Sequence, residues 1–332
     1  MNSGPSAQEI DEFQRIIATD DFPAFASTYL KVQSKTRGLI SFDLWPMQLD
    51  LWNTIKRLSI RRSLTLKYRQ GGFTKFWLGV HFYRALTTPD THCLLMAHEK
   101  ELPTELLADV GIFLEFLPKW FDVDLSRKSA SEIYFKDMRS SIRIGTGAML
   151  TEGAGAKLGR TVQHLHVTEA ADPRWKEDTF NMLFQTVPVG SSISIESTAK
   201  GARGWFHNEY KNAVAGRSTF HPFFYEWWWQ PEYQMDPPSD FVPTEREAWL
   251  MKEKGLTARQ IAFRRFKIDE LRGERNFLEL YPEDDESCFL LTGANYFDST
   301  ALRHQLESSF CAKDAVGRRF SIRQTHTTPI QY

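Results

Sequence analysis

The chain has 332 residues, 42% of them hydrophobic and 14% aromatic, which suits one large domain or two smaller ones and excludes long disordered stretches. The formal net charge of −1 argues neither for nor against a nucleic-acid partner. Three cysteines without a regular spacing, no signal peptide and no apolar run of bilayer length predict a soluble intracellular protein in a reducing compartment, without a zinc site.

The sequence pattern of the N-terminal part of the chain predicts helices. Their pattern covers part of residues 1–20 and residues 25–32, and a further helix begins at Pro46, which suits a first helical turn. Gln48 falls at the start of this last helix, shortly before a glycine-containing segment. Its amide can read the edge of an adenine base, and a surface glutamine is the alternative.

A basic stretch without carboxylates lies between Asp50 and Asp90. The basic residues in it are Lys56, Arg57, Arg61, Arg62, Lys67, Arg69, Lys75 and Arg84. We expect a local positive field there, which suits polyanions. For the first four of these residues, a solvated helix face is the alternative.

A β-branched apolar run, a glycine turn and an apolar helical run follow one another between residues 63 and 83. Strand, glycine turn and helix build a phosphate cradle, because glycine lets backbone N–H groups approach the ligand and the helix N-terminus adds positive charge. The nucleotide-binding candidates are Lys67, Arg69, Gln70, Gly71, Gly72, Thr74 and Lys75. The hydroxyl of Thr74 lies where it can reach a Mg²⁺ ion.

This turn departs from the usual P-loop, which ends in Gly-Lys-Ser/Thr, because Phe73 follows Gly72. Lys75 follows the hydroxyl residue and should point along the helix. Lys67 ends the strand, so its ammonium can fold back over the phosphates, and we assign the phosphate contact to Lys67. A Gly-Gly turn beside a basic surface strand is the alternative.

Strands and helices alternate in the rest of the first two thirds of the chain. Strands are predicted at 91–98, 162–167, 191–196 and 219–225, helices at 99–116, 176–186 and 206–215, and a hairpin within 132–144. This alternation favours a mostly parallel sheet flanked by helices, in which ligands bind beyond the carboxyl ends of the strands. The glycine turn, Thr168-Glu169 and Ser197-Thr198 all follow strand ends, so we expect them to converge.

A nucleoside triphosphatase needs a phosphate site, a metal held through few protein ligands and a carboxylate that positions water. Glu169 fits the water-positioning role. An Asp that supports the metal usually precedes this residue, and here Thr168 takes its place with a weaker, hydroxyl contact. Ser197 and Thr198 can sense the γ-phosphate through their hydroxyls. A surface helix cap for Glu169 and a simple turn for Ser197-Thr198 are the alternatives.

Two histidines, His164 and His166, lie two residues apart and so share one side of a predicted strand. No Cys or carboxylate partner completes a metal site with them, so structural packing is expected. Residues 231–243, rich in proline and acid, predict a linker, and two helices are predicted at 244–255 and 257–274.

Taken in order, these motifs resemble the large terminase subunit of tailed bacteriophages and prophages, from about Gln48 to Asp298. The motifs are Trp45-Pro46-x-Gln48, Lys67-x-Arg69-Gln70-x-Gly72-x-Thr74, Gly159-Arg160 leading to His166-Val167-Thr168-Glu169, Ser197-Thr198-x-x-Gly201 with Trp205-Phe206, and Tyr281-Pro282 with Phe289-Leu290 and Gly293 before Phe297-Asp298. The early lysine is similar to the deviant phosphate loop of lambda-type large terminases.

This resemblance implies an α/β fold: an ASCE-type P-loop NTPase with a mostly parallel sheet flanked by helices and a small helical lid. It implies an ATPase with ATP and Mg²⁺ as cofactors, which pumps double-stranded DNA into a procapsid. The implied partners are the portal, the small terminase subunit and further copies in a ring, with no membrane. The implied location is the cytoplasm of the bacterial host and not the mature virion.

Site roles are carried over by position. Gln48 is implied to contact adenine, the glycine-turn residues to hold phosphates and Mg²⁺, and Glu169 to activate water. Ser197 and Thr198 are implied to couple hydrolysis to movement. The family often has a trans-acting arginine just before the Gly-Arg pair, where this chain offers Lys157 and Arg160, and we favour Arg160.

Three parts of the chain are predicted: an ATPase domain with an N-terminal helical region over 1–230, a helical lid or linker over 231–298, and the start of a truncated or absent nuclease domain over 299–332. No acidic residue follows Asp314, so we expect no nuclease activity from this chain. Two alternatives stay open. Phe73 and Thr168 favour a non-hydrolysing DNA- or capsid-binding module on a degenerate P-loop fold, and the other alternative is a helicase-like ATPase outside packaging.

Overall fold

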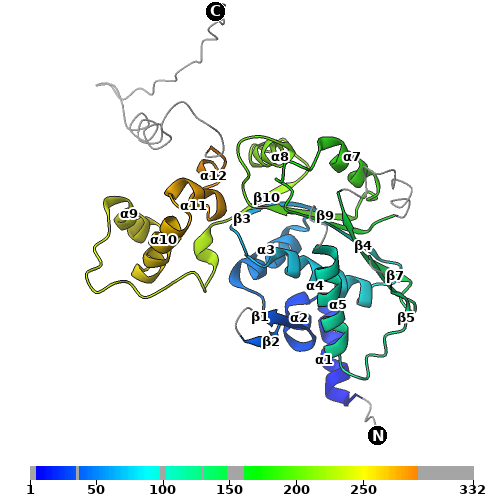
Figure 1. Cartoon of the computed structure of the whole chain (residues 1–332). Helices are drawn as coiled ribbons and strands as arrows, with labels where there is room; N and C mark the ends of the chain where they lie inside the picture. The colour runs from blue at the N-terminus through cyan, green and yellow to red at the C-terminus, as the bar shows by residue number, and fades with distance from the viewer. Residues whose placement is uncertain (1–4, 35–36, 98–101, 129–130, 148–160, 291–332) are drawn as a thin grey trace, which may run out of the picture. The chain divides into compact units, whose positions relative to one another are not determined.

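The computed structural model describes residues 5–34, 37–97, 102–128, 131–147 and 161–290 (Figure 1). The chain divides into two units, residues 1–291 and 292–332, and the whole of the second unit lies outside the described residues. The predicted nuclease-domain start over 299–332 therefore lies outside them. So do the two candidates for the trans-acting residue, Lys157 and Arg160.

The first unit is built on an eight-stranded sheet with the strand order β10-β3-β9-β8-β4-β7-β6-β5. Its strands are β3 (Arg62–Lys67), β4 (His92–Ala97), β5 (Leu125–Lys128), β6 (Glu132–Phe135), β7 (Ser140–Thr146), β8 (His164–Thr168), β9 (Ser192–Ser197) and β10 (His221–Tyr225). Neighbouring strands from β10 to β7 run parallel, whereas the pairs β7–β6 and β6–β5 are antiparallel. The predicted mostly parallel α/β sheet is confirmed.

Helices cover both faces of this sheet, and a small hairpin of β1 (Lys31–Ser34) and β2 (Gly38–Ser41) stands apart from it. The helices are α1 (Ala7–Thr19), α2 (Phe22–Tyr29), α3 (Pro46–Leu58), α4 (Phe73–Thr87), α5 (Leu102–Phe116), α7 (Glu177–Gln185), α8 (Trp205–Val214), α9 (Glu245–Glu253), α10 (Ala258–Glu270), α11 (Glu274–Leu280) and α12 (Ser287–Leu290), with a short 3-10 turn, η2 (Trp227–Trp229). Across the described residues, none of the helices has the length and apolar character that crossing a membrane requires.

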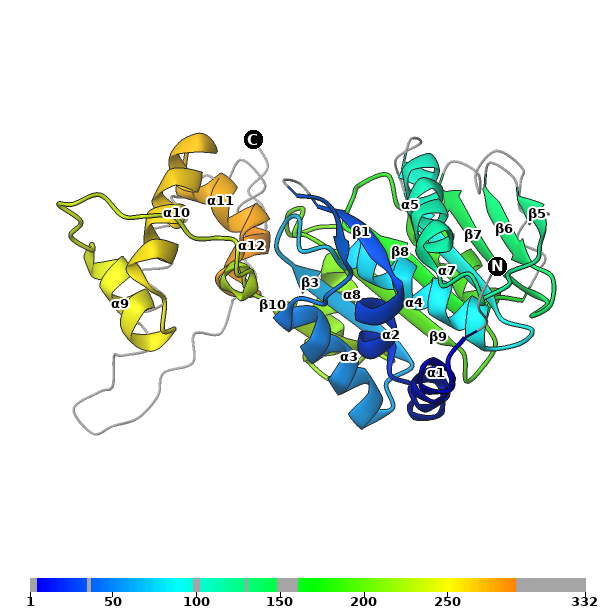
Figure 2. The ribbon, with the colours of Figure 1, turned by 90° about the horizontal axis from the view of Figure 1, so that it is seen from below.

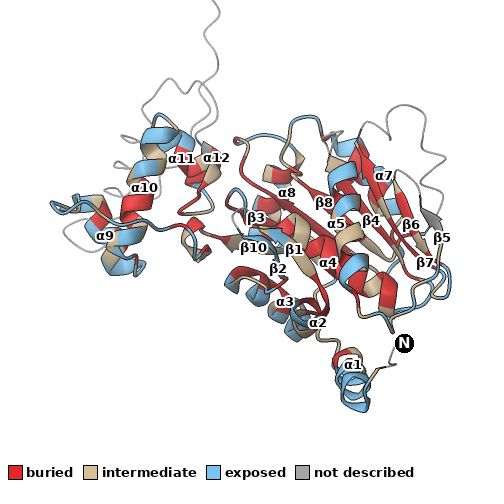
Figure 3. Ribbon diagram, turned by 60° about the horizontal axis from the view of Figure 1, so that its bottom comes forward, coloured by how far each residue is buried: buried red, intermediate tan, exposed pale blue. Residues whose placement is uncertain are grey.

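Two hydrophobic cores form because successive strand residues point to opposite faces of the sheet. In β4, Leu95 joins a core with α2 to α5, whereas Leu94 and Met96 join a second core with α7 and α8. The central strands are accordingly buried (Figure 3), and the helices on either side can be followed in Figure 2. Helices thus cover both faces of the central strands, so that only the ends of these strands are open to ligands.

Two local expectations are wrong. The helix predicted over 25–32 ends at Tyr29, because Leu30 is extended and Lys31–Ser34 pairs as a strand with Gly38–Ser41. The helix predicted over 257–274 ends at Glu270, since Arg272 and Gly273 take positive φ angles of 57° and 137° and a new helix, α11, starts after them. The strand β5 and the short helix α12 are not predicted at all.

The strand order decides where chemistry can occur. From β3 the chain crosses through α4 to β4, returns to β8 and β9, and then passes to β10 on the far side of β3. Because β9 lies between β3 and β8, the carboxyl ends of these three strands are adjacent, with Leu66 beside Ser197 and Thr168 beside Glu196. This reversal of strand order is where open parallel sheets bind ligands.

Candidate nucleotide-binding site

The glycine turn connects β3 directly to α4. Helix α4 begins at Phe73, immediately after Gly72, whose φ of 66° is left-handed and favours glycine. A Cβ atom built on Gly72 would lie 2.9 Å from Nε2 of Gln48, so no larger residue fits without displacing that side chain. The turn therefore presents the N-terminus of a fifteen-residue helix at the carboxyl end of β3, an arrangement that suits an anion.

The side chain of Gln48 supports the glycine turn through hydrogen bonds. Its Oε1 accepts a hydrogen bond from the backbone N of Trp45 at 3.0 Å, and its Nε2 donates to the carbonyls of Gly71 and Gly72 at 3.3 and 3.1 Å. The side chain is buried. The structure thus gives Gln48 a bracing contact with the turn, and its contact with adenine stays a prediction.

Lys67 lies at the centre of the site. Its Nζ is 2.9 Å from Oε1 of Glu169 and 3.2 Å from Oε2 of Glu196, and its side chain is 6% exposed. Burial alone would lower the pKa of Lys67, but the charges of the two carboxylates outweigh burial and raise it above its usual value. Lys75 instead extends to Asp109 of α5, at 3.0 Å. The ammonium group at the strand ends is that of Lys67.

Glu169 follows β8 in a left-handed conformation with φ of 51°, which costs a residue other than glycine roughly 1–2 kcal/mol. Its side chain is 32% exposed, so water reaches the carboxylate that Lys67 holds. Oε2 lies 3.5 Å from the hydroxyl of Thr198. Glu169 and Thr198, from two of the segments expected to converge, therefore lie together at the water-accessible edge of the site.

Glu196 is the functional candidate that the sequence reasoning missed. It is fully buried in β9, and its Oε1 accepts hydrogen bonds from the hydroxyls of Thr168 at 2.5 Å and Thr74 at 3.1 Å. Burial alone would raise its pKa, but the charge of Lys67, the nearby His166 ring and the hydrogen bond from Thr168 lower it to about 2. Glu196 is therefore an anion at neutral pH.

A signal for Glu196 is present in the sequence. A charged residue near the end of a predicted strand, directly before Ser197, cannot face solvent if that strand is central in the sheet.

The remaining candidates surround this centre. The Oγ of Ser197 accepts a hydrogen bond from the backbone N of Ala171 at 3.0 Å, which ties the end of β9 to the turn after β8. The backbone N of Arg69 donates to the carbonyl of Leu280, and the hydroxyl of Tyr233 donates to the carbonyl of Arg69, both at 2.7 Å. The side chains of Arg69 and Gln70 are exposed. The glycine turn is thus joined to the segment 231–290 through its backbone.

The oxygen atoms of this site suit Mg²⁺. The hydroxyls of Thr74 and Thr168 lie 3.0 Å apart, and both contact Oε1 of Glu196. Within the part of the chain that the structure describes, no group of three or more His, Cys, Asp and Glu residues forms a metal site by itself. Mg²⁺ is usually held by one or two protein ligands together with water and substrate phosphates, and hydroxyl and carboxylate oxygens are ligands of the kind it takes.

The folded chain is similar to the crystal structure of the HK97 bacteriophage large terminase, with a TM-score of 0.57, 14% sequence identity, and coverage of 79% of this chain and 54% of that one. The chain has the fold of a phage large terminase. This chain spans about half of the length of the HK97 protein, since the match covers 54% of it. No protein-family model matches the sequence, and no curated protein does so.

Two weaker similarities accompany this one. The Thermus phage P74-26 large terminase ATPase domain, as its R139A mutant, matches with a TM-score of 0.45 and 16% identity over 70% of this chain and 91% of that one. The UvsW helicase of bacteriophage T4 matches with a TM-score of 0.40 and 12% identity over 62% and 67%.

The histidines of β8 pack inside this fold. His166 stacks on Trp77 with ring centroids 5.6 Å apart, and its Nδ1 lies 3.0 Å from the hydroxyl of Ser194. The ring of His81 in α4 lies 6.3 Å from the rings of both His164 and His166. Burial is the main cause that lowers the pKa of all three histidines. The structure thus places His164 and His166 in packing positions, as predicted, and brings His81 beside them.

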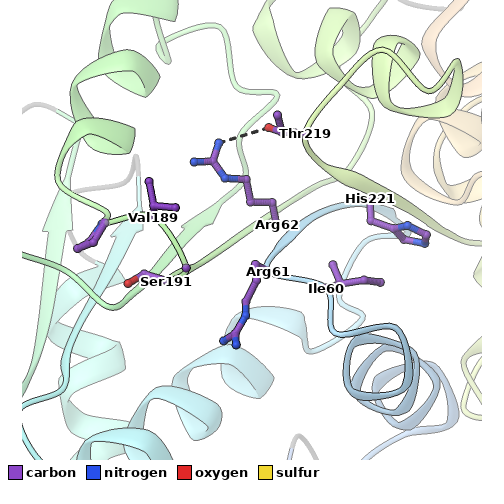
Figure 4. A pocket seen from close by; sticks show the side chains of 9 residues that line it. Ile60, Arg61, Arg62, Val189, Ser191, Thr219 and His221 are labelled. Atoms are coloured by element: carbon purple, nitrogen blue, oxygen red, sulfur yellow. Dashed lines mark hydrogen bonds between the residues drawn. The ribbon is translucent and has the colours of Figure 1, made fainter.

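A cavity of about 330 Å³ lies at the other end of the strands (Figure 4). Arg62 at the start of β3, Ser191 before β9 and His221 at the start of β10 line it, and Arg62 reaches Thr219 at 3.3 Å. These residues mark the amino ends of the strands. The cavity is therefore separate from the carboxyl-end site of Lys67, and the site rests on converging side chains instead of on an enclosed volume.

Proposed function

We propose that this chain is the ATP-hydrolysing motor domain of a phage terminase large subunit, which moves double-stranded DNA into a procapsid. The observation that carries the proposal is the meeting of Lys67, Thr74 and Glu169 at the carboxyl ends of adjacent strands. A cation, a metal-binding hydroxyl and a water-accessible carboxylate are the parts that phosphoryl transfer to water requires. The large-terminase fold supports the same conclusion.

The proposed roles follow from the contacts. The phosphates of ATP would lie over Gly71 and Gly72 at the N-terminus of α4, where the ammonium of Lys67 can reach them. A Mg²⁺ ion, when bound with ATP at Thr74 and Thr168, would neutralise charge on the phosphates. Lys67 now pairs with Glu169, so its move toward the phosphates would release that carboxylate to orient the attacking water.

Coupling to movement is proposed for two connections. Thr198 lies beside the Glu169 carboxylate, and Ser197 holds the turn after β8, so both hydroxyls are placed to respond when Glu169 changes partner. The backbone of Arg69 joins the glycine turn to Tyr233 and Leu280 in the helical segment. In the same proposal, residues 1–230 form the ATPase domain and 231–298 the lid.

The larger assembly is also part of the proposal. The chain would act in the host cytoplasm as a homo-oligomeric ring with portal, small subunit and DNA, and Arg160 of a neighbouring copy would complete each site.

The two departures from a normal P-loop have structural accounts that weigh against a non-hydrolysing module. Phe73 is buried, and its ring lies 5.6 Å from that of Tyr225, so it is a core residue at the start of α4. Thr168 is backed by the carboxylate of Glu196. These contacts support a site in which a lysine and an acid are both kept, each from an unusual position.

Glu169→Gln tests the proposal. Phosphate release from ATP should fall roughly 100-fold or more, because the neutral amide cannot accept a proton from water. Binding of Mg-ATP, measured by calorimetry, should persist. Glu177→Gln, an exposed first-turn residue of α7, serves as the matched control and should keep full turnover. Turnover by Glu169→Gln at the wild-type rate would contradict the assigned role.

A further inference from the structure

A carboxylate from the neighbouring strand occupies the region where β8 lacks one. P-loop ATPases usually carry a metal-supporting acidic residue directly before the catalytic glutamate, and here that position is Thr168. In the sheet, Thr168 of β8 is in register with Glu196 of β9, and the Thr168 hydroxyl lies 2.5 Å from Oε1 of Glu196. We propose that Glu196 is the carboxylate that supports Mg²⁺ in this site; the inference rests on the proposed ATPase function.

Counting protons supports this role. A threonine hydroxyl has one proton to donate and two lone pairs to offer. Thr168 donates its proton to Glu196, and Thr74 is placed to donate to the same oxygen at 3.1 Å. With its proton directed to Glu196, Thr74 keeps its lone pairs for a cation. A carboxylate that accepts from a ligating hydroxyl in this way orients the ligand and strengthens its metal contact.

Counting charges leads to the same assignment. Glu196 is 0% exposed, and a buried carboxylate without a partner cation is costly. Lys67 provides that cation at 3.2 Å from Oε2, which accepts no hydrogen bond in the described structure. When Lys67 turns to the phosphates, Glu196 needs another cation. Mg²⁺ arriving with the nucleotide at Thr74 would supply that charge.

A purely structural role for Glu196, as an anchor for Lys67, makes a different prediction. An anchor would affect nucleotide binding equally with and without metal, because Lys67 contacts phosphates in both cases. A metal-supporting carboxylate would affect only the part of the affinity that Mg²⁺ adds. Affinity for a non-hydrolysed ATP analogue, measured by calorimetry in Mg²⁺ and in EDTA, separates the two roles.

In the wild-type chain, Mg²⁺ should strengthen binding of the analogue. Glu196→Gln should lose about 10- to 100-fold of that gain and keep its affinity in EDTA. Moving the carboxylate back to β8 in Thr168→Asp/Glu196→Gln should restore the gain. Glu247→Gln, another buried glutamate that pairs with Arg265 in the helical segment, is the matched control and should behave as wild type.

Mn²⁺ bound with the analogue gives a second readout. Its electron paramagnetic resonance signal should show weaker binding to the Glu196→Gln complex than to wild type. Glu196→Asp covers the case in which Glu196→Gln does not fold, since it keeps the charge beside Lys67 but withdraws the carboxylate by one methylene from Thr74. It should also lose part of the Mg²⁺ gain.

The outcomes separate the two proposals. A full Mg²⁺ gain in Glu196→Gln or Glu196→Asp, or an equal loss in Mg²⁺ and in EDTA, would overturn the assignment of Glu196 and leave the ATPase proposal standing. Failure of the wild-type chain to bind the analogue in either buffer would overturn both.

Discussion

Three histidines packed inside the fold, of which His81 and His166 are buried and His164 is half-buried, should make the protein sensitive to mild acid. Burial, assisted by the charges of Arg84 and Arg61, lowers the pKa of His164 from 6.5 to about 4. The unfolded chain therefore takes up a proton on this residue near pH 6.5, whereas the folded chain does so only near pH 4. Stability from neutral His164 is complete above pH 6.5 and is lost as the pH falls toward 4.

The size of the effect follows from these values. At pH 5, about 1.5 pH units below the ordinary pKa, His164 alone should reduce the free energy of unfolding by about 2 kcal/mol. His81 and His166, whose pKa values burial also lowers, act in the same direction. The lowered pKa of Glu196, about 2, removes stability only below about pH 4.5, so it does not contribute in this window.

The assay is urea unfolding at pH 7.5 and at pH 5. The wild-type chain should lose at least 2 kcal/mol between the two values, a large share of typical domain stability. His164→Gln should lose about 2 kcal/mol less than wild type over the same interval, whereas His221→Gln, an exposed residue, should match wild type. An identical pH dependence in His164→Gln and wild type would refute the reasoning.

Two further substitutions test the packing of the site. Lys67→Ala should lower the free energy of unfolding by about 3–5 kcal/mol, because it leaves the buried Glu196 without its cation. Lys75→Ala breaks a partly exposed pair with Asp109 and should lower the same free energy by at most about 1 kcal/mol. Equal losses of the two variants in urea unfolding would contradict the central place of Lys67. Gly72→Ala should destabilise the chain more than Gly38→Ala does. Both glycines have positive φ angles, but only at Gly72 would the added Cβ atom lie against the side chain of Gln48. The same unfolding midpoint for both variants would show that Gln48 does not brace the turn.

Local patterns were sufficient to predict much of this fold. Short-range sequence patterns predict the strand, glycine turn and helix around Gly72. The alternation of strands and helices that follows predicts the parallel sheet. Errors arose where a backbone angle or a pairing decided the outcome. Arg272 and Gly273 break a continuous helical pattern with positive φ angles, and Val32 joins a strand because β2 is available to pair with it.

The site shows the same limit more sharply. Thr168 and Glu169 follow an apolar strand, so their place at a strand end is visible in the sequence. The position of Glu196 at the end of a predicted strand is visible as well, but its contact with Thr168 is not, because that contact depends on the register between β8 and β9, which a single sequence does not specify. Glu196 and Thr168 are far apart in the sequence, although Oε1 of Glu196 lies 2.5 Å from the hydroxyl of Thr168 in the structure.

The proposed ATPase function depends most on whether the glycine turn is an ATP site that uses Lys67. Calorimetry of Mg-ATP binding to the wild-type chain, to Lys67→Ala and to Lys75→Ala tests this directly, with each variant first shown to be folded. We predict micromolar binding, worth roughly 8 kcal/mol, that persists in Lys75→Ala and collapses in Lys67→Ala. Binding that survives in Lys67→Ala, or no binding by the wild-type chain, would contradict it.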